Sequence, residues 1–430
     1  MKTAAVITEY NPFHNGHMLQ ARLVKEKTGA DYVVAIMSGD FVQRGAPAIL
    51  DKYDKAACAL SGGIDLVVEL PVSFALGSAD AFASAGAAIA SAMGIDYLCF
   101  GCEEPDLGKL SAAAAVQEEE GNEFKSLLKE GLKAGLPFAA ANGAALSHVL
   151  HEKDPSLFPS EEGAAEFIKQ PNNILGIAYL RSLQALHSST VPVALPRTGN
   201  AYHSLSLEGG NPSASAVRAG VWEAVSRGTA LSEIPGLKEA VPAATFKALE
   251  KAMEEKRLQQ ADDYSSILFY LLEKETPESL QAKGIRKDLA ARILSCRGEA
   301  ASFSQLAGLV KNRSLTYASV SRTLMRLILE LPFMGSPEGK KHSLPEDLKS
   351  SLYAHVLGLR KEARPLLSWF SKRGSIPLVT SLAGDVPRLS ENQHTQISQG
   401  LSATRIYRDI EKAISGSPAI DEYRQKLLIM

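Results

Sequence analysis

Apolar residues along the first hundred positions alternate between short continuous runs and longer stretches with helical spacing. The continuous runs cover Thr3–Thr8, Asp31–Ser38, Ile64–Leu70 and Tyr97–Phe100, and helical spacing separates them. Continuous apolar runs are typical of strands that are buried on both faces of a parallel sheet. The alternation therefore predicts consecutive βαβ units and a right-handed, doubly wound parallel sheet.

Farther along the chain, the same patterns predict more helices and one more strand. Residues 106–165 predict helices joined by loops, Asn173–Leu186 predicts a helix, and Val191–Leu195 predicts a fifth strand. A further helix is expected to start within Ser213–Arg218, because serines at a helix start cap free N–H groups.

The pattern changes near residue 245, after which strand-like runs become rare. Helical periodicity dominates there, as in Tyr264–Leu272, Ser319–Leu331 and Leu348–Leu359. Between Pro235 and Pro242 the chain carries the breakers that a junction needs. We therefore predict an α/β, Rossmann-like domain over residues 1–240 and a second, mainly helical domain over residues 241–430.

The turn after the first predicted strand has the sequence Asn11-Pro12-Phe13-His14-Asn15-Gly16-His17. Ligands of open α/β sheets bind outside the carboxyl ends of the strands, and a helix N-terminus favours an anion. Two imidazoles beside a glycine suit a phosphate-bearing ligand, because they can donate hydrogen bonds to charge that develops on phosphate oxygens. The alternative, a His-x-x-His metal pair, has no further ligands at metal-binding spacing.

Other polar groups follow the later predicted strands and helix starts, where they would reach the same crevice. They are Gly101, Asn172, Asn173, Arg197, Ser213, Ser215 and Arg218. Arginines and capped helix starts commonly neutralise polyphosphates. The chain has no Gly-x-x-x-x-Gly-Lys-Ser/Thr sequence, and no Gly-x-Gly-x-x-Gly follows the first strand. Both absences argue against P-loop and dinucleotide-binding folds.

The composition, 45% hydrophobic and 22% charged over 430 residues, is ordinary for a soluble globular protein. The Ala/Gly-rich stretch Phe82–Met93 is too short to span a bilayer, and we expect a closely packed helix there. We interpret Cys99-x-x-Cys102 as a pair of incidental buried thiols, consistent with a reducing compartment. The N-terminus does not resemble a signal peptide, so we expect a cytoplasmic location and no membrane association.

The net charge of −2 conceals an uneven distribution along the chain. Residues 301–430 carry 18 Lys and Arg against 11 Asp and Glu, which leaves 28 against 37 for residues 1–300. The whole excess lies in residues 311–373, with 12 basic against 5 acidic residues. A basic segment attached to an acidic enzyme-like part fits a module that binds a polyanion.

The His14-x-Gly16-His17 turn is similar to the signature of the nucleotidyltransferase superfamily, and Ser213-x-Ser215-x-x-Arg218 resembles the phosphate-binding helix start of these enzymes. A longer set of segments resembles the bacterial tRNA(Met) cytidine acetate ligase family. That set comprises Glu9–His17, Ser38–Gly45, Asp65–Pro71, Phe100-Gly101 and Pro171–Gly176, and it continues at Thr316–Arg326, Tyr353–Gly358 and Pro377–Thr380. Two positions depart from the family pattern: Asp40 replaces an expected Asn, and Lys55 an expected Arg.

The resemblance implies an ATP-dependent ligase with a nucleotidyltransferase-type sheet. ATP would activate acetate as acetyl-AMP, and Mg²⁺ would enter with ATP, held mostly by phosphates and water. The N4 amine of the wobble cytidine in elongator tRNA(Met) would then attack the acetyl carbonyl and yield N4-acetylcytidine. Two alternatives stay open: a small-molecule adenylyl- or cytidylyltransferase of the same superfamily, and a non-catalytic RNA-binding protein on a nucleotide-binding scaffold.

The resemblance also implies site residues, with His14 and His17 as the catalytic pair that stabilises charge on the α-phosphate. The implied ATP site comprises Ile7, Thr8, Glu9, Tyr10, Asn11, Pro12, Phe13, His14, Asn15, Gly16, His17, Met18, Leu19, Gln20, Gly101, Asn172, Asn173 and Arg197, with Ser213, Ser215 and Arg218. The candidates for acetate are Asp40, Gln43 and Arg44. The predicted tRNA contacts are Lys311, Arg313, Arg322, Arg326, Lys340, Lys341, Arg360, Lys361, Arg364, Lys372 and Arg373, with Tyr353 and Trp369 as candidate base-stacking residues.

Overall fold

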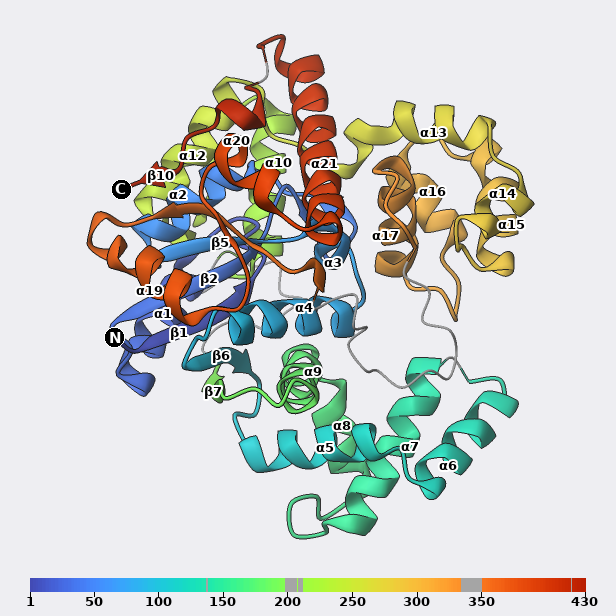
Figure 1. Ribbon diagram of the computed structural model, residues 1–430. Helices are drawn as coiled ribbons and strands as arrows, with labels where there is room; N and C mark the ends of the chain where they lie inside the picture. The colour runs from blue at the N-terminus through green and yellow to red at the C-terminus, as the bar shows by residue number, and fades with distance from the viewer. Residues whose placement is uncertain (137, 198–206, 208–211, 334–349, 419) are drawn as a thin grey trace.

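The computed structural model describes residues 1–136, 138–197, 207, 212–333, 350–418 and 420–430. Helices enclose a central sheet, and a group of helices extends from it on each of two sides (Figure 1). Among the described residues, none of the helices combines the length and the hydropathy that a membrane span requires.

Eight strands of the described chain form one sheet in the order β10-β8-β5-β2-β1-β6-β7, with β9 paired to β8. The strands are β1 (Thr3–Thr8), β2 (Tyr32–Ser38), β5 (Leu66–Leu70), β6 (Tyr97–Cys102), β7 (Val191–Pro196), β8 (Ala354–Leu359), β9 (Leu378–Val379) and β10 (Leu428–Ile429). The five strands expected from the apolar runs are confirmed, and they pair in parallel from β5 through β2, β1 and β6 to β7. The chain order of the strands reverses at β1, and such a switch point is where α/β sheets bind ligands.

Helices cover both faces of this sheet, as a doubly wound fold requires. Alternate residues of β1 face two different cores, with Ala5 in one and Ala4 and Val6 in the other. One core is closed by α4 (Ala79–Ala92) and α9 (Pro171–Ala185), and the other by α1 (Asn15–Thr28), α2 (Lys52–Ser61), α10 (Ala214–Arg227) and α12 (Ala243–Glu254).

The Ala/Gly-rich stretch is the closely packed helix that its composition predicts. In α4, a Cβ added at Gly86 would lie 2.5 Å from a side-chain carbon of Ile7 in β1. Small residues thus let α4 approach the central strand near the point where β1 ends.

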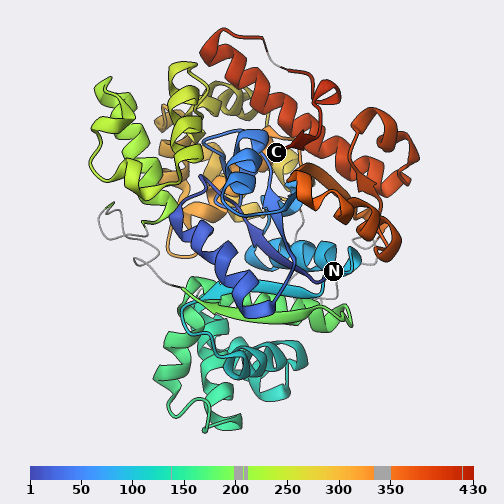
Figure 2. The same cartoon turned by 90° about the vertical axis from the view of Figure 1, so that its left-hand side faces the viewer.

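Four helices form a group that packs against α9 on the side away from the sheet, at the bottom of both views (Figures 1 and 2). They are α5 (Leu107–Glu119), α6 (Asn122–Lys133), α7 (Phe138–Lys153) and α8 (Glu161–Lys169), which confirms the helices predicted for residues 106–165. Their buried residues continue the core that α4 and α9 close.

A second helical group, here called the helical unit, spans residues 261–331 and packs around a core that includes Leu268, Leu306 and Leu324. It comprises α13 (Ser265–Glu273), α14 (Pro277–Ala282), α15 (Lys287–Cys296), α16 (Phe303–Val310) and α17 (Tyr317–Ile328). The helices predicted over 264–272 and 319–331 are confirmed as α13 and α17.

The prediction of a helix over residues 348–359 is wrong for residues 354–359. These six buried residues form β8, which pairs antiparallel with β5 and so departs from the all-parallel expectation. A short apolar run does not distinguish a strand from a buried helix by periodicity, and the partner edge that decides between them lies far away in the sequence.

Residues 241–430 therefore do not form one separate helical domain. Strands β8, β9 and β10 belong to the first sheet, and α12 covers one of its faces. The long helix α21 (Glu391–Ser415) packs beside α3 (Val72–Ala75), which follows β5 directly. The core of the helical unit is completed by residues from outside it, among them Phe41, Val72 and Tyr407, so this unit is packed onto the rest of the chain.

Candidate active site

The turn between β1 and α1 holds its two histidines by reciprocal hydrogen bonds. His14 is the N-cap of α1, and its Nδ1 accepts from the backbone N–H of Gly16 at 3.1 Å. The backbone N–H of His14 donates to Nδ1 of His17 at 3.2 Å, which closes a capping box. Because both Nδ1 atoms accept, each neutral ring carries its proton on Nε2.

The two imidazoles stack with their ring centroids 3.7 Å apart and both line a pocket. Burial lowers the pKa of His14 to about 3, and the positive charges of Arg197 and Arg218 act in the same direction. Burial also lowers the pKa of His17 well below its usual value, with smaller contributions from His14 and Arg197. Both rings are therefore neutral near pH 7 and can act as Nε2–H donors.

Aromatic side chains from the same turn support the histidine pair from behind. The ring of Tyr10 lies 4.7 Å from His17 and 4.8 Å from Phe13, measured between centroids. Tyr10 adopts a left-handed backbone conformation with φ 45°, which is strained for a non-glycine residue and persists where packing determines it. Phe13 is fully buried.

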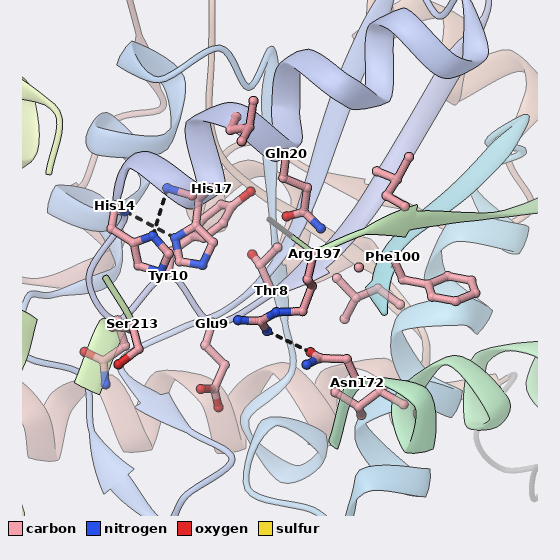
Figure 3. A pocket seen from close by; sticks show the side chains of 18 of the residues that line it. Thr8, Glu9, Tyr10, His14, His17, Gln20, Phe100, Asn172, Arg197 and Ser213 are labelled. Carbon is pink, nitrogen blue, oxygen red and sulfur yellow. Dashed lines mark hydrogen bonds between the residues drawn. The ribbon is translucent and has the colours of Figure 1, made fainter. Parts of the chain in front are cut away.

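The pocket encloses about 260 Å³ at the carboxyl ends of β1, β6 and β7, beside the N-termini of α1, α9 and α10. Figure 3 shows that its labelled side chains come from these elements or from the residues that adjoin them. This is the place at which the strand order reverses, as the position of the histidine turn predicts.

Arginines and helix starts give one side of the pocket a positive character. Ser213 caps α10, its Oγ accepting from the backbone N–H of Ala216 at 3.1 Å. One nitrogen of Arg218 donates to Ser215 Oγ at 3.2 Å, and another donates to the backbone carbonyl of Asn11. Arg197 donates to Asn172 Oδ1 at 3.1 Å, and the dashed line in Figure 3 marks this bond. Helix dipoles and fixed guanidinium groups together favour a polyphosphate.

Most of the predicted ATP residues lie around the pocket. Those that line it are Ile7, Thr8, Glu9, Tyr10, Asn11, His14, Gly16, His17, Leu19, Gln20, Gly101, Asn172, Arg197, Ser213, Ser215 and Arg218. The pocket lining does not include Pro12, Phe13, Asn15, Met18 or Asn173.

The excluded residues have other contacts that explain their positions. Asn15 donates to the carbonyl of Glu239, Met18 is exposed, and the buried amide of Asn173 donates to the carbonyl of Phe167. The side chains of Phe82 and Tyr179 complete the apolar wall, and sequence reasoning missed them because buried aromatic residues of a core and of a pocket look alike in sequence.

Of the three acetate candidates, Gln43 and Arg44 line the pocket and Asp40 does not. Asp40 is buried, and its two oxygens accept from the backbone N–H of Lys52 at 2.9 Å and from Thr404 Oγ1 at 2.7 Å. The assignment of Asp40 to acetate is therefore wrong. The segment that follows β2 contains a small antiparallel pair, β3 (Phe41–Val42) with β4 (Ala46–Pro47).

The predicted basic surface is divided by the fold. Lys311 and Arg313 are exposed on the helical unit ahead of α17. Arg360 pairs with Asp65 and Arg373 pairs with Asp96. These two carboxylates precede β5 and β6, so they lie at the amino ends of the strands, opposite the pocket. The exposed Lys361, Arg364 and Lys372 belong to the same segment as Arg360 and Arg373, and Lys340 and Lys341 lie outside the described residues.

Several residues predicted to contact nucleic acid are instead buried or bonded to other parts of the protein. Arg326 is 6% exposed and donates to the carbonyls of Ser73, Leu76 and Pro332, so the prediction that it contacts tRNA is wrong. Arg322 is half-buried and donates to the carbonyl of Gln43. Tyr353 is buried, which excludes it as a base-stacking residue, and Trp369 packs partly buried against the core.

The described residues contain no group of three or more His, Cys, Asp or Glu side chains that could hold a metal ion. Within the described lining, Glu9 is the only carboxylate. Mg²⁺ can be held largely by substrate phosphates and water with one or two carboxylates, so these residues fit a metal that arrives with a nucleotide.

Comparisons with known proteins show which family this chain is similar to. The HIGH Nucleotidyl Transferase family profile matches residues 1–419. The tRNA(Met) cytidine acetate ligase of Halothermothrix orenii is 33% identical over 432 residues, covering 100% of this chain and 99% of the relative. The protein of the same name from Acetivibrio thermocellus is 33% identical and covers 100% of both chains.

Two crystal structures of Thermotoga maritima TmcAL share the fold. The apo structure has a TM-score of 0.87 at 26% identity, and the structure bound with alpha-thio ATP has a TM-score of 0.84 at 26% identity. Each covers 100% of both chains, so the similarity includes the sheet, the histidine turn and both helical groups.

Proposed function

The chain belongs to the tRNA(Met) cytidine acetate ligase family of HIGH nucleotidyl transferases, and from this premise we propose that it uses ATP to join acetate to a cytidine of tRNA(Met). The product is N4-acetylcytidine at the wobble position of elongator tRNA(Met), formed through acetyl-AMP. The observation that carries the proposal is the neutral His14–His17 pair, which lines a pocket together with Arg197 and Arg218.

In the first step, a carboxylate oxygen of acetate attacks the α-phosphorus of ATP. The bond from that phosphorus to the bridging oxygen breaks, and pyrophosphate leaves. Negative charge grows on the non-bridging oxygens of the α-phosphate, and the Nε2–H groups of His14 and His17 donate to it. Positioning and electrostatic stabilisation of this kind are the main contributions that proteins make to reactions at phosphorus.

In the second step, the N4 amine of cytidine attacks the carbonyl carbon of acetyl-AMP. The carbon–oxygen bond to the phosphate breaks, AMP leaves, and the amine gives up one proton to solvent. Neither step needs a covalent link to the protein, so the pocket acts by holding the reacting groups together.

The acetate-binding residues are proposed to be Gln43 and Arg44. Both line the pocket, and the side-chain nitrogen Nε2 of Gln43 is buried without a hydrogen-bond partner. An unpaired buried donor is costly, and a carboxylate oxygen of the substrate would satisfy it. Mg²⁺ is proposed to enter with ATP, with Glu9 as the available carboxylate.

The tRNA is proposed to contact the exposed Lys311 and Arg313 on the helical unit. A polyanion of this size reaches well beyond the pocket, so the basic residues of the 360–373 segment stay candidates for a more distant contact. A tRNA substrate also supports a cytoplasmic location.

The proposed function is tested by incubating the purified protein with ATP, Mg²⁺, radiolabelled acetate and unmodified elongator tRNA(Met), followed by nucleoside analysis. ATP-dependent label in N4-acetylcytidine is expected, and His17→Ala should abolish it. His148→Ala is the matched control, because His148 lies on α7 and does not line the pocket. Pyrophosphate release with another small acid and no label in tRNA would favour a small-molecule nucleotidyltransferase.

A further inference from the structure

Helix α17 of the helical unit packs directly on the loop that carries Gln43 and Arg44. Gly45 marks the closest approach: a Cβ there would lie 2.2 Å from the backbone nitrogen of Arg322 and 2.4 Å from the carbonyl carbon of Ser321. Gly45 also has φ 77°, a conformation that glycine adopts without strain. The backbone of the loop and the backbone of α17 are therefore in direct contact.

Two side chains of α17 bind the loop through its carbonyl groups. Ser321 Oγ donates to the carbonyl of Gly45 at 2.9 Å, and a guanidinium nitrogen of Arg322 donates to the carbonyl of Gln43 at 3.2 Å. Ser321 is buried and Arg322 is half-buried. Burial lowers the pKa of Arg322 from its usual value, and the negative charge of Glu9 opposes that shift.

Gln43 is also held on its other side, by a residue of the pocket. The backbone N–H of Gln43 donates to Glu9 Oε1 at 2.6 Å, and Glu9 lines the pocket directly after β1. Gln43 is thus fixed through its N–H by the catalytic turn and through its carbonyl by α17. Its side chain and that of Arg44 line the pocket.

We propose that Arg322 is a positioning residue, which holds Gln43 and Arg44 against the reacting groups from a helix outside the sheet. The helical unit then takes part in forming acetyl-AMP and does not serve tRNA binding alone. This inference rests on the proposed function for its kinetic consequence, and it revises the prediction that Arg322 contacts tRNA.

The test uses Arg322→Gln in the full chain, with Arg322→Lys as the conservative variant and Arg286→Gln as the control. Arg286 belongs to the same helical unit, is exposed, pairs with Asp288 and does not line the pocket. Three readouts are measured: acetate-dependent exchange of pyrophosphate into ATP without tRNA, amide hydrogen exchange of residues 41–47, and tRNA affinity as a function of salt concentration.

For Arg322→Gln, we expect the KM for acetate to rise about tenfold while the tRNA affinity and its salt dependence stay unchanged. Hydrogen exchange should accelerate in residues 41–47 and not in β1 or β6. Arg322→Lys should recover part of both effects, because an ammonium can still donate to the Gln43 carbonyl. Ser321→Ala, a smaller change, keeps the test usable if Arg322→Gln fails to fold, and it should accelerate exchange at the same loop.

The opposite pattern would overturn the inference. If Arg322→Gln weakens tRNA binding and reduces its salt slope while loop exchange and the acetate KM stay at wild-type values, Arg322 is a tRNA contact. If the wild-type protein shows no acetate-dependent exchange, the proposed function fails, and loop hydrogen exchange alone then decides whether Arg322 positions the loop.

Discussion

His14 and His17 each have one ring nitrogen fixed by a backbone N–H group of the turn that carries them. The backbone N–H of His14 donates to Nδ1 of His17, while Nδ1 of His14 accepts from Gly16, and the rings stack at 3.7 Å. The protons of both neutral rings are thereby directed to Nε2, the nitrogen that remains for a ligand. The pair thus has its donors arranged before a nucleotide binds.

We predict that protonation of His14 or His17 causes no loss of activity with a midpoint near pH 6.5. Burial lowers the pKa of His14 to about 3 and lowers that of His17 well below its usual value, so neither ring of the free enzyme titrates near pH 6.5. The measurement is kcat/KM for ATP as a function of pH, which reports groups of the free enzyme. An acid limb near pH 6.5 that disappears in His14→Gln would contradict the assignment.

The same lowered pKa values predict a pH dependence of stability. Below pH 6.5 the unfolded chain protonates these histidines and the folded chain does not, so the unfolded state binds more protons. The free energy of unfolding should therefore fall as the pH decreases from 6.5 toward 3. Urea titrations of the wild type and of His14→Gln should show a smaller fall in the variant over that window.

Gly45→Ala should destabilise the protein more than Gly228→Ala does. Both glycines have positive φ, 77° and 66°, but an added Cβ meets the backbone of α17 at Gly45 and open space at Gly228. Conformational strain of about 1–2 kcal/mol applies to both, and overpacking adds about 1–3 kcal/mol at Gly45 only. Chemical denaturation measures the difference, and equal losses for the two variants would show that the contact between α17 and the loop is absent in solution.

Lys52→Ala should cost about 3–5 kcal/mol of unfolding free energy, because it leaves two buried carboxylates without their cation. Lys52 Nζ lies 2.6 Å from Glu422 Oε1 and 3.1 Å from Glu69 Oε2, and Lys52 is 1% exposed. The control is Lys251→Ala, which removes an exposed pair with Glu255 and should change stability by less than about 1 kcal/mol. Similar losses for the two variants would be inconsistent with a buried ionic network.

The buried ionic network around Lys52 also predicts that the free energy of unfolding falls in acid. Burial alone would raise the pKa of Glu69, but the charge of Lys52 and the hydrogen bond with His355 lower it to about 2. Its contribution to stability is present above the unfolded pKa of about 4.3 and is lost as the pH falls toward 2. Lys52→Ala should remove most of this dependence, which urea titrations between pH 5 and 2 would measure.

The two departures from the family pattern, Asp40 and Lys55, should be energetically coupled. Lys55 Nζ donates to the carbonyls of Ser38 and Gly39 at 2.8 Å each, next to Asp40 in the chain. Burial lowers the pKa of Lys55 to about 8, and the charge of Asp40 is the largest influence in the opposite direction. A double-mutant cycle of Asp40→Asn and Lys55→Met should give a coupling of about 0.5–3 kcal/mol, whereas additive losses would show that the two departures are independent.

The pH dependence of Asp40→Asn provides a second check on this pair. Between the folded pKa of Lys55 near 8 and its unfolded value near 10.4, the unfolded chain binds more protons, so stability rises with pH. Removing the negative charge of Asp40 lowers the pKa of Lys55 further. The rise in stability should therefore begin at a lower pH in Asp40→Asn than in the wild type.

The catalytic side of the pocket was predictable because its interactions are local. His14, Gly16 and His17 hydrogen-bond within four residues of chain, and their place after an apolar run identifies the strand end where ligands bind. The acetate side was only partly predictable. Asp40 and Gln43 are three residues apart in one loop, yet Asp40 is buried against Thr404 and Gln43 lines the pocket.

By itself, the sequence determined the parallel strands, the histidine turn and the serine-capped start of α10, since each depends on neighbouring residues and a regular period. Only the tertiary structure decided that residues 354–359 form a strand, because β5 supplies the partner edge and Glu69 meets His355 from 286 residues away. It also decided the roles of the arginines of α17. A charge in the sequence does not tell whether carbonyl groups or solvent will surround it, and the folded chain places Arg322 and Arg326 against carbonyl groups.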